Sequence, residues 1–216
     1  MLRRWAVGLT LVFVLCILLI RARTYDSQSI RGLLLPPEHC PAPCFMGLRP
    51  GHSTFDDATD FFRTRPDIEY FVQQSQAEVD AMDVLHWRDA SSGLNGSMNF
   101  VNDRLVEISL SGLRLHHIWL ALGEPDGGQV VTEMLYLDQR RFIHMPIVHI
   151  GYYTINDFRV NIASACLEFW EQRAHIVMGE TVMPKQLNPT QSLAYQRRFA
   201  CQQQRAYRQA QRRLWQ

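Results

Sequence analysis

The sequence predicts an α+β fold, in which helices cover one face of an antiparallel sheet and one N-terminal transmembrane helix precedes the sheet domain. Three observations lead to this prediction. The chain begins with an uninterrupted apolar run, two later stretches have the apolar period of a helix, and several short segments alternate apolar and polar residues. Helices and strands without a regular βαβ order favour antiparallel pairing.

The apolar run at residues 5–20 is flanked by arginines and contains no charged residue. Its 16 residues make about 24 Å of helix, slightly less than the ~30 Å hydrocarbon core of a bilayer. Because Arg21 and Arg23 can snorkel, we expect residues 1–23 to be a single-pass anchor in the cell membrane that places the main domain outside the cytoplasm. A cleaved signal peptide is the alternative, but the residues after Ile20 lack the small side chains of a cleavage site.

Residues 24–52 are rich in proline, which predicts an extended linker between the anchor and the domain. Cys40 and Cys44 enclose Pro-Ala-Pro in this linker, and an oxidising compartment would permit a disulfide between them. Either cysteine could instead pair with Cys166, or both could be free thiols, because the prolines favour an extended chain. A metal site is not expected, since the Cys-x3-Cys pair lacks a second pair of ligands.

Charge divides the chain into an acidic body and a basic tail. Residues 32–180 contain 10 arginines against 20 aspartates and glutamates, whereas residues 181–216 contain one lysine and six arginines without an acidic residue. An acidic body repels phosphates, so we expect no nucleic-acid ligand. The body is long enough for one hydrophobic core, and we place a single extracytoplasmic domain at residues 53–180.

Two amphipathic helices are expected to cover the sheet. Ser53 or Thr54 can cap the first helix, acidic residues follow in its first turn, and Pro66 stops it. The second helix occupies residues 113–122, with apolar side chains at the i, i+3, i+4 and i+7 positions and Gly123 placed to end it. Each helix ends in Pro-Asp and is followed by a hairpin-like segment, so a duplicated helix-plus-hairpin unit is expected.

The first hairpin is predicted from two alternating segments at residues 94–101 and 106–110. A three-residue loop at residues 102–104 would place Phe100 opposite Val106 on the same face, whereas a two-residue loop would oppose an apolar and an acidic side chain. We therefore expect the three-residue loop.

Further segments complete the predicted sheet. Residues 167–178 are expected to form another hairpin, which turns at Glu171 and Gln172. The remaining predicted strands lie at residues 82–88, 130–137, 147–154 and 158–163.

The tail at residues 181–216 is predicted to be mostly one helix rich in glutamine and arginine, with a narrow apolar stripe. There are three interpretations of this tail: an exposed, half-ordered segment, docking onto the acidic body, and binding to a partner or to anionic lipids. The arginines that would contact a partner are Arg197, Arg198, Arg205, Arg208, Arg212 and Arg213.

No motif in the sequence identifies a catalytic residue, a cofactor site or a metal site. His-Glu-x-x-His, the Gly-x-Ser-x-Gly elbow and the P-loop do not occur. The adjacent His116 and His117 point about 100° apart on a helix, so we interpret them as surface histidines. A pocket that brings His86, Cys166 and His175 together with an acid would indicate a hydrolase.

Two stretches of the chain resemble known bacterial proteins. CPAPCFMGLRPGHSTFDDA (residues 40–58), followed by ALGEPDGG (residues 121–128), is similar to a group of uncharacterised, membrane-anchored bacterial proteins with the pattern C-x3-C-x2-G-x2-P-G-x-[ST]-[ST] and a later L-G-x-P-D. Residues 51–54 and 122–125 carry a weaker resemblance to the SmpA/OmlA outer-membrane assembly lipoproteins and the β-lactamase-inhibitor-protein-like fold. This chain departs from those lipoproteins because it lacks their cysteine and adds a basic tail. The resemblance implies a binding or assembly domain and transfers no catalytic residue.

The sequence thus predicts a membrane-anchored interaction or envelope-assembly module without catalytic activity. It implies an extracytoplasmic protein partner, whose identity and stoichiometry the sequence leaves open. An exported hydrolase with a site scattered along the chain and a small-ligand sensor are the alternatives. Dispersed histidines and a broad apolar or acidic face would favour the binding module over the hydrolase.

Overall fold

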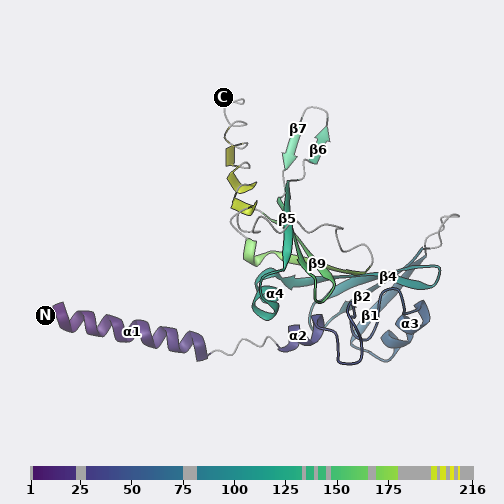
Figure 1. The fold of residues 1–216 in the computed structure, drawn as a ribbon, viewed down its shortest axis with the longest axis horizontal. Coiled ribbons are helices and arrows are strands. Elements are labelled where there is room, and N and C mark those ends of the chain that lie inside the picture. The colour runs from purple at the N-terminus through teal and green to yellow at the C-terminus, as the bar shows by residue number, and fades with distance from the viewer. Residues whose placement is uncertain are drawn as a thin grey trace.

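The structure is a computed structural model, and it shows an α+β fold built on one large antiparallel sheet (Figure 1). It describes residues 2–22, 28–74, 82–132, 135–138, 141–144, 147–164 and 169–179, and in the tail residues 196–198, 200–202, 205, 206 and 209. The predicted α+β class with an antiparallel sheet is confirmed.

Five helices precede the tail, the large sheet has eight strands, and a separate hairpin has two. The helices are α1 (Leu2–Ala22), α2 (Gln28–Leu34), α3 (Phe55–Arg63), α4 (Leu115–Leu122) and the short 3-10 helix η1 (Phe169–Glu171). The strands of the sheet are β1 (Ile68–Gln74), β2 (Met82–Asp89), β3 (Asn95–Val101), β4 (Arg104–Arg114), β5 (Gly127–Thr132), β8 (Ile147–Tyr153), β9 (Phe158–Ser164) and β10 (Arg173–Gly179). The separate hairpin consists of β6 (Leu135–Asp138) and β7 (Arg141–His144).

The two halves of the chain build the sheet with the same order of elements. The sheet order is β1-β2-β3-β4-β10-β9-β8-β5, so each half contributes a helix and then four strands that run from an edge to the centre. At the centre β4 pairs with β10, with Leu110 opposite Ile176 and Ile108 opposite Met178. The repeated unit is therefore a helix with four strands, and not the helix-plus-hairpin unit that was predicted.

One face of the sheet is apolar, and both α3 and α4 pack against it. Phe62 of α3 stacks on Tyr70 and Trp87, with ring centroids 5.7 and 6.2 Å apart. Leu115 and Ile118 of α4 are fully buried in the same hydrophobic core. Placement of these helices on one face agrees with the sequence prediction.

Helix α3 begins where the sequence predicted. The hydroxyl of Thr54 accepts a hydrogen bond from the N–H of Asp57 (3.2 Å), and the Asp57 carboxylate accepts one from the N–H of Thr54 (2.8 Å). Hydrogen bonding of the Asp57 carboxylate to the backbone N–H of Thr54, and secondly to the Thr54 side chain, lowers the pKa of Asp57. This reciprocal capping satisfies two backbone donors that a helix end otherwise leaves open.

The turn between β3 and β4 differs from the prediction. It has two residues, Asn102 and Asp103, whose positive φ angles (51° and 65°) suit a type I′ turn and match the twist of the strands. A register shift beside Phe100 then inserts an extra residue in β4, so Met98 still lies opposite Ile108. The three-residue loop was wrong because a bulge in the strand, and not the loop, corrects the register.

Residues 28–52, the described part of the predicted linker, are packed rather than extended. Leu34 of α2 is buried, and Phe45 and Leu48 lie in the same core. Cys40 and Cys44 form a disulfide, one of the alternatives that the sequence left open, with their Cα atoms 6.0 Å apart. The prediction of an extended linker is therefore wrong for this part of residues 24–52, because apolar side chains between the prolines reach the core.

Residues 169–178, the described part of the hairpin predicted at residues 167–178, do not form that hairpin. The turn expected at Glu171 and Gln172 belongs to η1 and its exit, and β10 pairs with β9 on one side and β4 on the other. The predicted strand at residues 130–137 is likewise divided between β5 and β6, whereas β2, β8 and β9 lie where they were predicted. Strand β1 was not predicted.

Helix α1 is 21 residues long and lies apart from the sheet (Figure 1). Among the helices that the structure describes, none combines the length and the apolarity needed to cross a bilayer.

Gly96 of β3 tests the packing of the apolar face. A Cβ atom at this position would lie 2.8 Å from the ring of Trp87 and would also collide with the carbonyl oxygen of Ser109. We expect Gly96→Ala to lower the free energy of unfolding by about 1–3 kcal/mol in urea denaturation. Gly32→Ala is the control, since no atom lies within 4 Å of the added methyl group. Equal stability of the Gly96→Ala variant and the parent would contradict this packing.

Candidate functional site

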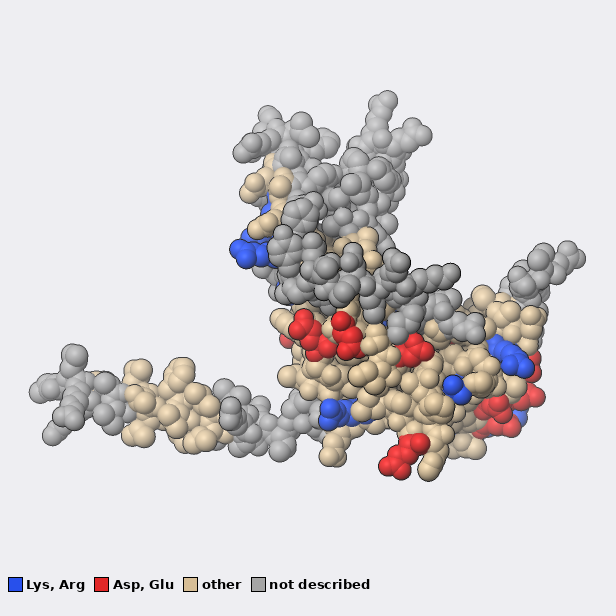
Figure 2. All heavy atoms as spheres, viewed as in Figure 1, with Lys and Arg blue, Asp and Glu red and all other residues tan. Residues whose placement is uncertain are grey.

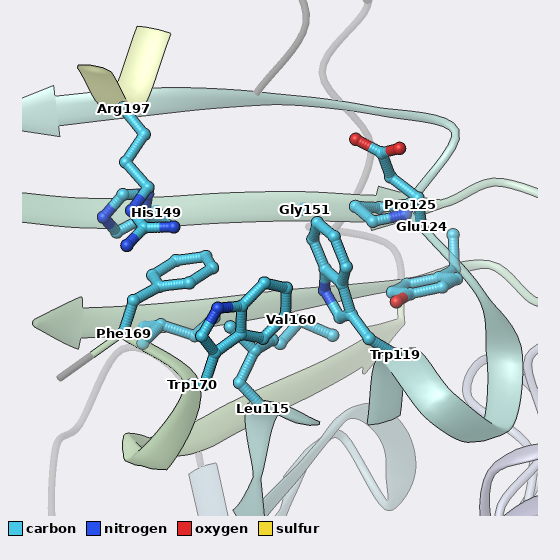
Figure 3. A pocket seen from close by; sticks show the side chains of 12 residues that line it. Leu115, Trp119, Glu124, Pro125, His149, Gly151, Val160, Phe169, Trp170 and Arg197 are labelled. Carbon is cyan, nitrogen blue, oxygen red and sulfur yellow. The ribbon is translucent and has the colours of Figure 1, made fainter. Parts of the chain in front are cut away.

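An aromatic pocket lies between α4, η1 and the strands β8 and β9 (Figure 3). Its cavity volume is about 240 Å³. The walls are mostly apolar, and the charged residues and the histidine that line the pocket are Glu124, Arg197 and His149. The pocket lies on the sheet face that the helices cover.

The aromatic wall is formed by Trp119 of α4 and by Phe169 and Trp170 of η1. The ring of Trp170 meets Trp119 edge to face at 4.9 Å and Phe169 at 5.1 Å. Trp119 faces the pocket together with Leu115, because residues four apart share one side of a helix. The tight turn of η1 places the consecutive rings of Phe169 and Trp170 in the pocket wall.

Two hydrogen bonds hold η1 against α4. The carbonyl oxygen of Trp170 lies 2.9 Å from Nδ1 of His116, and the Arg114 guanidinium donates to Glu171 at 2.6 Å. Both contacts are on the surface, so their main effect is to orient the turn that carries the two rings.

The floor of the pocket comes from alternate residues of two neighbouring strands, His149, Gly151 and Tyr153 of β8 and Val160 and Ile162 of β9. Gly151 leaves space here, since a Cβ atom would lie only 3.0 Å from the ring of Pro125. The Tyr153 hydroxyl donates to the carbonyl oxygen of Gly123 at 2.9 Å. Burial, together with the nearby Asp126 and Glu124, raises the pKa of Tyr153, so it remains a neutral donor.

His149 is a buried histidine at one end of the pocket. Its ring lies 4.7 Å from that of Phe169. Burial lowers the pKa of His149 to about 4, and the positive charge of Arg197 adds to the effect. The imidazole is therefore neutral at pH 7 and brings no charge to the pocket.

The C-terminal tail docks beside the pocket. The guanidinium of Arg197 lies 3.8 Å from the ring centroid of Phe169, which is a cation–π geometry. Gln196 accepts a hydrogen bond from the N–H of Val130 (2.9 Å) and donates one to the carbonyl oxygen of Gly128 (3.4 Å). Figure 3 shows Arg197 reaching from the tail helix toward His149 and Phe169.

The tail therefore docks onto the body through its first described turn. Ala200 is buried, Cys201 is disulfide-bonded, and Arg197 packs on the body. Arg198 and Arg205 are exposed, and Figure 2 shows basic side chains on the tail helix above the acidic side chains of the body. The other arginines predicted to contact a partner, Arg208, Arg212 and Arg213, lie outside the described residues.

The groups that would have indicated a hydrolase are dispersed. His86 of β2 and His175 of β10 lie outside the pocket, with two strands between them, which is roughly 14 Å at ~4.8 Å per strand. His175 contacts Ser111 at 3.0 Å, but no described carboxylate hydrogen-bonds its ring. Cys166 lies outside the described residues. Within the described part of the chain, no three potential metal ligands lie together.

Only part of this pocket is predicted by patterns in the sequence. The helical period placed Trp119 and Leu115 on one side of α4, and this signal was correct. Phe169 was expected in a strand, and Arg197 was expected to contact a partner. Their contact joins segments that no local pattern connects.

Comparison of the chain with protein-family models, with curated proteins and with solved structures gives no match. The interpretation of the pocket therefore depends on its own geometry.

The low pKa of His149 predicts a dependence of stability on pH. The unfolded chain, with a histidine pKa near 6.5, takes up a proton as the pH falls toward 4, whereas the folded chain does not. We expect stability to fall by on the order of 3 kcal/mol between pH 7 and pH 4 through this residue. Urea denaturation across this range measures the effect, and His149→Phe should remove this part of the pH dependence. An unchanged pH dependence in His149→Phe would contradict the assignment.

Proposed function

We propose that the protein is a membrane-anchored, extracytoplasmic binding module without catalytic activity, and that the aromatic pocket is its binding site. The observation that carries this proposal is the pocket itself, in which four aromatic rings and a neutral histidine surround an open cavity. Apolar pockets with few polar groups are typical of binding sites. The dispersed histidines favour such a module over a hydrolase.

The size of the cavity favours a protein partner. Pockets for small molecules usually enclose about 300–1,000 Å³, and this cavity encloses about 240 Å³. One large apolar side chain from a partner fits this volume, in the manner of an interface anchor. The exposed Glu124 at the rim favours a partner with a basic residue beside that anchor.

The anchor part of the proposal is supported by α1. Its large apolar side chains are exposed, for example Leu9 at 72% and Phe13 at 68%, and they have no protein surface to cover them in the described structure. With arginines at both ends of the run, insertion into the cell membrane would bury this surface. The Cys40–Cys44 disulfide is consistent with a body outside the cytoplasm.

A small-ligand sensor is the second candidate, and the position of Arg197 favours it. Because Arg197 belongs to the tail and packs on a ring that lines the pocket, a ligand that displaces it would change the docking of the tail. This candidate uses the same pocket but predicts a change in the tail upon binding.

Photocrosslinking tests the pocket as the partner site. A photoreactive phenylalanine at Trp170, on the pocket lip, should capture a partner in native membranes. The same probe at Leu120, which is exposed on α4 outside the pocket lining, should not. Adding Gly151→Leu should fill the cavity and reduce capture at least tenfold, a change of about 1.4 kcal/mol. Capture that persists with Gly151→Leu would contradict the proposal, and thermal melting verifies that this variant folds.

Membrane fractionation tests the anchor. We expect the full chain to remain in the membrane pellet after alkaline extraction, because integral helices resist this treatment and surface-bound proteins do not. A variant that lacks residues 2–22 should become extractable. Complete extraction of the full chain, or retention of the shortened variant, would contradict an anchor at α1.

A further inference from the structure

The two edges of the large sheet differ in their protection. At the β5 edge, the side-chain amide of Gln196 pairs with the backbone of Gly128 and Val130, as a neighbouring strand would. At the β1 edge, the described residues place no strand beside β1. An open edge of this kind can pair with another strand.

The hydrogen bonds of β2 show which backbone groups of β1 point out of the sheet. The backbone N–H of Asp89 in β2 donates a hydrogen bond to the carbonyl oxygen of Leu94. The backbone N–H and C=O groups of the odd-numbered residues of β2 therefore point toward β3, and those of the even-numbered residues point toward β1. His86 lies opposite Phe71, and neither register contains a shift. The backbone groups of Phe71 therefore point toward β2, and those of Tyr70 and Val72 point outward from the sheet.

The side chains of β1 leave this edge unprotected. Phe71 is 64% exposed and Val72 is 39% exposed. Seven residues, IEYFVQQ, form the strand, and they include no proline, lysine or arginine. Natural edges are usually blocked by such residues, by bulges or by a covering segment. The only charged residue of β1 is Glu69.

We propose that β1 pairs antiparallel with β1 of a second copy of this chain, about a twofold axis at Phe71. In this register all seven residues are paired, Phe71 lies beside its symmetry mate, and Tyr70 lies opposite Val72. Glu69 lies opposite Gln73, so no like charges face each other. Shifting the axis to Tyr70 or Val72 would pair only five residues. A twofold contact through one shared surface is the usual form of a homodimer.

This pairing joins two sheets into one and covers the exposed rings. The ring of each Phe71 already stacks on His86 at 4.8 Å, so the two copies form a continuous row of four rings on one face. The inference is independent of the aromatic pocket, which lies in the other half of the sheet.

Disulfide crosslinking tests both the partner and the register. At the axis, Phe71 would form a pair without hydrogen bonds, where Cα atoms are about 4.5 Å apart and a disulfide can close. Phe71→Cys in the full chain should give a crosslinked dimer upon mild oxidation. A Cys16→Ala background removes the exposed free cysteine of α1. Ile155→Cys, 83% exposed in the turn between β8 and β9, is the control for random collision.

A second pair of variants separates this register from others. Glu69→Cys and Gln73→Cys should each fail to crosslink alone, because equivalent atoms would be roughly 13 Å apart at ~3.4 Å per residue. The two variants mixed should crosslink to each other. Glu69→Cys dimers that form as readily as Phe71→Cys dimers would overturn the register, and a crosslink of Phe71→Cys to another protein would overturn the second copy as the partner.

The oligomeric state of the chain without introduced cysteines provides an independent test. We expect the full chain in mild detergent to sediment as a dimer, and Phe71→Lys to sediment as a monomer with an unchanged circular dichroism spectrum. Since Phe71 is exposed, the lysine should not disturb folding of the single chain. A monomeric parent, or a dimer that survives Phe71→Lys, would overturn the proposal.

Discussion

The pairing of β4 with β10 is the contact on which the rest of the structure depends. It joins the last strand of each half, so two helix-and-strand units form one sheet with one shared apolar face. The fit is close, because a Cβ atom on Gly179 would lie 3.1 Å from the Cα atom of Glu107. Since α3 and α4 must both cover this one face, α4 also becomes the wall of a pocket over β8 and β9. Without the central pair, each half would have an open edge and a core too small to be stable.

The pocket combines groups whose properties depend on one another. Burial of His149 lowers its pKa and keeps it neutral, so in the proposed binding site the rings of Trp119, Phe169 and Trp170 would be the main recognition surface. Glu124 and Arg197, the charged residues that line the pocket, belong to the loop before β5 and to the tail. A binding partner would therefore meet an apolar centre with an acid and a base at its rim, which is the usual composition of an interface anchor site.

Local patterns in the sequence predicted the elements better than the contacts between them. The cap at Thr54, the period of α4 and the alternation of β2, β8 and β9 are all local signals, and the structure agrees with them. The prediction of a three-residue loop at residues 102–104 was wrong. A two-residue loop alone would place Met98 opposite Glu107, but a bulge beside Phe100 corrects this register. Strand β1 was missed because Phe71 and Val72, both exposed, break the usual alternation. The contact of Arg197 with Phe169 joins residues 28 positions apart, and no periodicity reports such a pair.

The contact between the Gln196 side-chain amide and β5 affects the order in which parts of the chain fold. It replaces a ninth strand at β5, yet it lies 66 and 68 residues further along the chain than its two backbone partners. Contacts with such a separation close late, because the loop between them must first lose its conformational freedom. A chain that has been synthesised only as far as β10 thus contains all eight strands of the sheet, but the edge strand β5 is still unprotected. The segment that carries Gln196 leaves the ribosome after β10 and closes that edge, and a chain released before this segment is made would expose the edge to its neighbours.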